Sequence, residues 1–202
     1  MKLFAISAVL LVSSLAAHVA RADDEFKPYG YVTVGASRSD ATFDGTLKDA
    51  FGVNGTVGDT WGANGHAGYR FHKYLAGEVE YEWMKDFQMR VNGVDIGKMQ
   101  TQVATANLKV IAPFGAFEPY FLVGAGAIFT SVDKAFFANY DVANGVFTMK
   151  FGAGLDYWLT PNMSLSLGAE VVTNSAKITG ITGNGGEGID YLTGQFGFGF
   201  KF

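Results

Sequence analysis

Asp190-Tyr-Leu-Thr-Gly-Gln-Phe-Gly-Phe-Gly-Phe-Lys-Phe202, the end of the chain, alternates between two kinds of side chain. Its apolar positions are Phe196, Phe198, Phe200 and Phe202, and its polar or small positions are Gln195, Gly197, Gly199 and Lys201. Because successive residues of a β-strand point to opposite faces, the stretch predicts a strand with four phenyl rings on one side. Such a face would promote aggregation in water. The alternation therefore favours a strand that faces lipid on one side and a narrow polar interior on the other.

The same residues carry a resemblance. The spacing of Gln195, Gly197, Phe200 and Phe202 resembles the C-terminal signal by which the barrel-assembly machinery recognises bacterial outer-membrane β-barrel proteins. That resemblance implies two partners, the assembly machinery and outer-membrane lipid. A buried strand of a soluble sandwich is the alternative that this stretch leaves open.

The N-terminus has the layout of a secretory signal peptide. Lys2 precedes an apolar run over 3–15, and Ala20-Arg21-Ala22 supplies an A-x-A cleavage site. The run is too short for a membrane anchor, which needs about 20 apolar residues. We expect cleavage after Ala22, so residues 1–22 are the signal peptide and residues 23–202 the mature domain. An exported chain has no cytoplasmic function.

Composition supports an exported barrel. The 27 glycines all follow residue 22 and are about twice the usual ~7% of a chain, as a tightly curved barrel tolerates. No cysteine is present, so the protein does not depend on disulfides. The net charge is −4, and it becomes more negative once Lys2 and Arg21 leave with the signal peptide. This excess of acid argues against nucleic acid as a partner.

Eight segments of the mature chain are expected to form strands long enough to cross a bilayer. They are 28–37, 61–71, 75–91, 94–111, 119–130, 147–157, 164–173 and 190–202. The connections alternate between short (72–74, 112–118, 158–163) and long, polar ones (38–60, 84–99, 131–146, 174–189). This order predicts an all-β fold, an eight-stranded antiparallel up-and-down transmembrane β-barrel, with both termini on the side of the short turns.

Parity predicts the register of two hairpins. Phe71 and Leu75 are both expected to face lipid, so the turn between them should hold residues 72–74 and place His66 opposite Glu80. Asn92-Gly93 is a strong two-residue turn signal, which would pair residue 91 with residue 94 and place Asn107 opposite Glu78.

Several segments look like the small OmpA-like outer-membrane barrel family. They are Gly68-Tyr-Arg-Phe-His-Lys-Tyr-Leu-Ala-Gly-Glu-Val-Glu-Tyr81, Glu118-Pro-Tyr-Phe-Leu-Val-Gly-Ala-Gly126, Phe151-Gly-Ala-Gly-Leu-Asp-Tyr157 and the terminal strand. The resemblance implies a monomeric eight-stranded barrel of the Gram-negative outer membrane. It also implies roles in anchoring, adhesion, immune evasion or passage of small solutes. Because the sequence ends at the last strand, we expect no peptidoglycan-binding domain.

The expected inner face carries an ion-pair network. Its members are Arg70, Glu78, Glu80, Glu82, Lys109, Lys150, Asp156 and Glu170. Charges in a narrow lumen should pair, because an unpaired buried charge costs several kcal/mol. A structural plug that fills the bore is one interpretation. A proton or ion path gated by Arg70, Glu78 and Lys109 is the other, and the extra glutamates would bias it toward cations.

Enzyme chemistry finds little support. The mature chain has two histidines, no cysteine, and no serine expected beside His66, so we predict no catalytic residues. Asp40, Asp44, Asp49 and Asp59 lack the spacing of a Ca²⁺ loop, so we predict no metal and no cofactor. The sequence predicts a non-catalytic envelope protein that displays surface loops and whose surface ligand is unknown. A narrow passive channel for small or hydrophobic solutes and an exported lipocalin-like soluble carrier are the alternatives.

Overall fold

The computed structural model describes residues 26–41, 55–57, 59–91, 94–132, 145–175 and 189–202. These residues form nine β-strands in one antiparallel sheet. The strands are β1 (Tyr29–Ala41), β2 (Gly55–Val57), β3 (Thr60–His72), β4 (Leu75–Val91), β5 (Val94–Ile111), β6 (Phe117–Val132), β7 (Val146–Trp158), β8 (Met163–Ser175) and β9 (Ile189–Lys201). Among the described residues, no helix is long and apolar enough to cross a bilayer.

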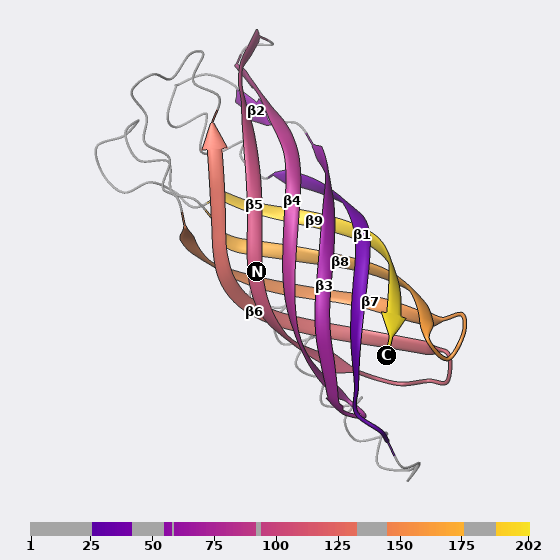
Figure 1. Ribbon diagram of the computed structural model, residues 1–202. Helices are drawn as coiled ribbons and strands as arrows, with labels where there is room; N and C mark the ends of the chain where they lie inside the picture. Colours follow the sequence, from indigo (N-terminus) through magenta and orange to yellow (C-terminus); the bar gives the residue numbers. More distant parts are fainter. Residues whose placement is uncertain (1–25, 42–54, 58, 92–93, 133–144, 176–188) are drawn as a thin grey trace, which may run out of the picture.

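Eight of the strands close into a barrel (Figure 1). Each pairs with its neighbour in the sequence, and β1 closes the cylinder by pairing with both β3 and β9. The short connections β3–β4, β5–β6 and β7–β8 gather at one end, together with the start of β1 and the C-terminus. The predicted eight-stranded, up-and-down all-β barrel is confirmed.

The small strand β2 was not expected. It lies within the range 38–60, which was predicted as a connection, and pairs with β4 at Met89–Val91. β4 and β5 extend beyond the other strands at the end away from the short turns, so the edge of β4 is uncovered there. Pairing with β2 satisfies backbone groups along that edge.

The two predicted registers are confirmed in the spanning part of the barrel. His66 lies opposite Glu80, Asn107 lies opposite Glu78, and Val91 lies opposite Val94. The three-residue turn 72–74 is wrong by one residue, because His72 itself pairs with Leu75 and the register shifts between Arg70 and His72. This bulge absorbs the extra residue and lets a two-residue turn close the hairpin while Phe71 still faces outward.

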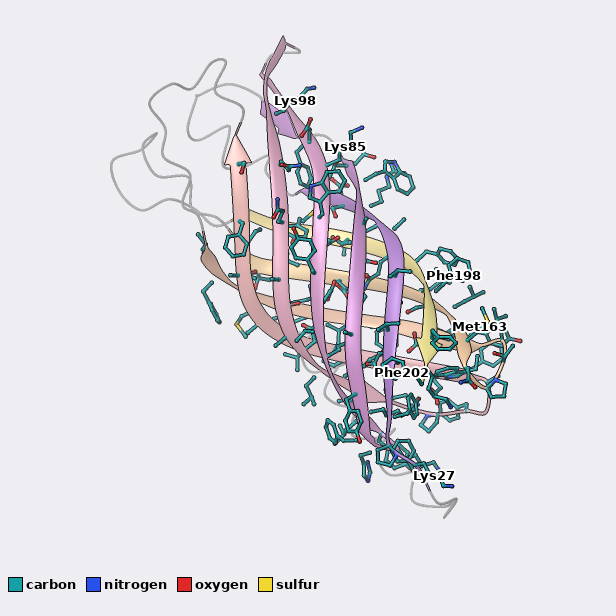
Figure 2. The ribbon with its side chains drawn as sticks, viewed as in Figure 1. Lys27, Lys85, Lys98, Met163, Phe198 and Phe202 are labelled. Atoms are coloured by element: carbon teal, nitrogen blue, oxygen red, sulfur yellow. The ribbon has the colours of Figure 1, made fainter. Side chains whose placement is uncertain are left out.

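The barrel is apolar outside and polar inside. Val34, Leu167 and Phe198 are 64%, 56% and 54% exposed. Figure 2 shows Phe198, Met163 and Phe202 projecting from the outer surface, whereas Lys85 and Lys98 lie at one end of the barrel and Lys27 at the other. The buried positions include eight charged residues of the strands. This is the reverse of a water-soluble protein and is the arrangement of a barrel in lipid.

Candidate functional site in the barrel lumen

The lumen is filled by charged side chains that project from six strands. Seven of the eight residues predicted for the network are buried, namely Arg70, Glu78, Glu80, Glu82, Lys109, Lys150 and Glu170. Asp156 also faces inward but is partly exposed. Each of them sits on the inner face because its parity is opposite to that of the lipid-facing residues on the same strand.

Lys150 is the centre of the network. Its Nζ lies 2.6 Å from Oε1 of Glu80 and 2.7 Å from Oε2 of Glu170, and its side chain is fully buried. Asn107 donates to the other oxygen of Glu80 at 3.0 Å, and Gln195 donates to Glu170. One ammonium thus joins a carboxylate of β4 to a carboxylate of β8.

His66 lies beside two carboxylates. Its Nδ1 is 3.5 Å from Oε1 of Glu78 and 3.8 Å from Oε2 of Glu80. Tyr31 donates a 2.7 Å hydrogen bond from its hydroxyl to the second oxygen of Glu78. The Glu78 carboxylate therefore contacts the Tyr31 hydroxyl through one oxygen and the His66 imidazole through the other.

Lys109 pairs with Asp156 on the far side of β6. The distance from Nζ to Oδ2 is 2.8 Å, and the same Nζ lies 3.8 Å from the centroid of the Tyr120 ring. The hypothesis of a gate formed by Arg70, Glu78 and Lys109 placed these three charges together. Among the described side chains, no ion pair joins Glu78 to either cation, because each cation has a nearer acid elsewhere.

Arg70 pairs with Glu118, a residue that sequence reasoning missed. Nη1 of Arg70 donates to both carboxylate oxygens, at 2.9 and 2.8 Å, and to the hydroxyl of Tyr29 at 2.8 Å. The indole Nε1 of Trp158 donates to Glu118 as well, at 2.8 Å. We expected 119–130 as the strand and assigned Glu118 to the turn. Since β6 begins at Phe117, Glu118 is an even-numbered, inward residue like Tyr120 and Leu122, and this parity could have found it.

Glu82 is the exception in the network. It is 1% exposed, and neither carboxylate oxygen has a hydrogen-bond partner among the described residues. The hydroxyls of Ser37 and Tyr191, also on inner faces, are unpartnered in the same sense. This level of the lumen is the least satisfied part of the network.

Two cavities inside the lumen are small. One of about 10 Å³ lies beside His66 and Glu78, and another of about 20 Å³ lies between Tyr31 and Asp156. Each has room for about one water molecule. Neither could hold a solute.

The predicted assembly signal spans both faces of β9. Phe200 and Phe202 are exposed to the lipid side, Gly197 is buried, and Gln195 faces the lumen, where it contacts Asn64 and Glu170. The ring of Phe202 packs against Gly30, and its backbone N–H donates to the Gly30 carbonyl at 3.0 Å. The predicted cleavage residues Ala20 and Ala22 lie outside the described residues, and so do most of the long connections.

Comparison with known proteins agrees with this architecture. Residues 7–202 match the family model described as "Outer membrane protein beta-barrel domain". No curated protein sequence matches the chain.

Three similar solved structures are outer-membrane or surface proteins. Neisserial surface protein A is 15% identical with a TM-score of 0.57, and the match covers 87% of this chain and 97% of that one. OprG from Pseudomonas aeruginosa is 19% identical with a TM-score of 0.54, covering 87% and 94%. Ail, the attachment invasion locus protein of Yersinia pestis, is 16% identical with a TM-score of 0.57, covering 88% and 100%. These likenesses show the fold, and the family model shows the family. The chain therefore belongs to the family of outer-membrane protein β-barrel domains, which lie in the lipid of the Gram-negative outer membrane.

Proposed function

We propose that this protein is a sealed, non-catalytic barrel whose lumen network is a structural plug. The observation that carries the proposal is the centre of the lumen, where Lys150 joins Glu80 and Glu170 in full burial. Ion pairs that link strands across the bore stiffen the cylinder and fill its cross-section. The function of such a sealed barrel is to display its long connections at the outer surface of the cell.

The surroundings of the two histidines agree with a barrel that has no catalytic role. His66 faces two carboxylates, and His72 accepts a 3.4 Å hydrogen bond from the backbone N–H of Tyr74. Within the described ranges, neither histidine is paired with a serine, and no three His, Asp or Glu side chains form a group that could hold a metal ion.

The two alternatives are less well supported. A passive channel needs an open path, whereas the lumen level of Lys150 is occupied by three buried side chains. A lipocalin-like carrier needs an apolar interior and a polar exterior, and this barrel has the opposite arrangement.

Conductance decides between plug and channel. The purified barrel, reconstituted in a planar bilayer, should show no discrete current steps. A variant in which Lys150, Glu80 and Glu170 are all changed to Ala has short side chains at the centre of the lumen and should conduct. Its current shows that the barrel inserts into the bilayer, so it serves as the control for insertion. Regular single-channel steps from the parent protein would contradict the plug.

We also propose that the mature chain starts at Asp23 after cleavage behind Ala22, that the assembly machinery binds the terminal strand, and that the barrel is monomeric. Mass spectrometry of the outer-membrane form tests the cleavage site, and light scattering in detergent tests the monomeric state.

Deletion of Phe202 tests recognition by the assembly machinery. It should lower the amount of protein in the outer membrane several-fold, whereas Phe114→Ala, at an exposed turn residue, should not.

A further inference from the structure

A larger cavity lies at the end of the barrel where the short turns gather. Its volume is about 320 Å³, at the lower end of the range of small-molecule sites. Residues of the start of β1, of the three short connections and of the end of β9 line it. It adjoins the small void beside Tyr31, with which it shares Tyr29, Arg70, Glu118 and Trp158 as lining residues, and it shares none with the void beside His66.

Positive charge predominates among the residues that line this cavity. Arg70, Lys73 and Lys201 contribute three cations, and Glu118 contributes one carboxylate. Arg70 is held by Glu118 through both carboxylate oxygens. Lys201 is therefore left without a carboxylate partner among the described residues that line the cavity.

Lys201 is the cation best placed to meet a ligand. Its Nζ lies 4.6 Å from the ring centroid of Tyr29 and 5.2 Å from that of Trp158, so two aromatic faces hold the ammonium in place. It forms no ion pair or hydrogen bond from Nζ with a described residue. An ammonium has three donors, and the rings accept none of them as a carboxylate would.

Most of the remaining lining is apolar. Phe26, Pro113, Trp158 and Pro161 line the same space, together with the polar Thr160. A site with one ordered ammonium and largely apolar walls suits an anion that carries an apolar group, because a bare inorganic anion would leave those walls uncovered.

We propose that this cavity binds the carboxylate of a small organic acid with an apolar or aromatic side group, such as the C-terminal residue of a short peptide. Lys201 contacts the carboxylate, and Trp158 and the prolines cover the apolar group. This proposal does not depend on the proposed plug: a conducting barrel could still bind the acid, and a sealed barrel could fail to bind it.

Nuclear magnetic resonance of the refolded full barrel in micelles tests the site. The indole N–H signal of Trp158, assigned with Trp158→Phe, reports on binding. N-acetyl-L-phenylalanine should shift it saturably, and the uncharged amide of the same compound should not. Equal shifts by acid and amide would overturn the role of the charge, and equally tight binding of inorganic phosphate would overturn the apolar part of the ligand.

Variants locate the contact. Lys201→Gln should weaken binding of the acid at least tenfold, Lys201→Arg should restore it to within a few-fold, and Lys85→Gln at the opposite end should change nothing. Because Lys201 lies in the terminal strand, each variant is first checked for a heat-modifiable folded band on a gel. Pro113→Trp, which fills the cavity from another wall, should also abolish binding, and unaltered binding in this variant would contradict the location.

The chain has carboxylates of its own close in sequence to a residue of the site. Asp23, Asp24 and Glu25 precede Phe26 in the sequence. The titration is therefore run on chains that begin at Asp23 and at Phe26. Saturable binding in either supports the proposal, and tighter binding by the shorter chain would mean that these acids compete for the same site. No saturable shift in both would overturn it.

Discussion

Lys150 shows at the scale of one residue what a charged lumen depends on. Lys150→Met keeps most of the side-chain volume but leaves Glu80 and Glu170 buried without their shared cation. Removing one partner of a buried ion pair costs about 3–5 kcal/mol, so the free energy of unfolding should fall by about that amount. Urea unfolding in lipid vesicles, followed by tryptophan fluorescence, measures the change.

The same experiment contains its control. The triple variant Lys150→Met, Glu80→Gln, Glu170→Gln removes all three charges and should recover most of the lost stability, because no carboxylate is left unpaired. If Lys150→Met alone unfolds at the same urea concentration as the parent, the buried pairs contribute nothing to stability.

At the scale of the element, glycine is needed where two strands approach closely. A Cβ on Gly126 of β6 would overlap the carbonyl oxygen of Ala104 and lie 2.7 Å from Cα of Thr105, both on β5. Backbone atoms cannot move aside as a side chain can, so Gly126→Ala should destabilise the barrel by about 1–3 kcal/mol. Gly194 of β9 has no atom within 4 Å of an added Cβ, so Gly194→Ala should change stability by less than ~0.5 kcal/mol. Equal effects in the same unfolding assay would contradict a position-specific need for glycine.

At the scale of the whole molecule, the outer surface decides which solvent the barrel requires. Val34 lies midway along β1 on the lipid face, and Asp40 lies on the same face near the outer rim. In a bilayer, Val34→Arg should cost about 2–4 kcal/mol and Asp40→Arg only about 0–1, because the penalty for a charge depends on depth. Parallel unfolding curves in vesicles compare the two. Equal, small costs would mean that this face does not meet hydrocarbon.

The alternation of single residues determined the two faces of each strand, and this largely settled the fold in advance. Strict period-2 patterns such as Val79, Tyr81 and Trp83 against Glu78, Glu80 and Glu82 have only one arrangement in lipid. The same parity, with the turn at Asn92-Gly93, predicted the register between adjacent strands, since pairing across one hairpin is a local matter.

Contacts across the bore were decided only by the tertiary structure. Lys150 reaches Glu80 over 70 residues of sequence, and Arg70 reaches Glu118 from a strand that is not its neighbour. Which levels of distant strands meet depends on the tilt and stagger with which the sheet closes, a property of all eight strands together. The sequence by itself therefore determined which residues enter the lumen, and closure of the barrel decided which charges meet there.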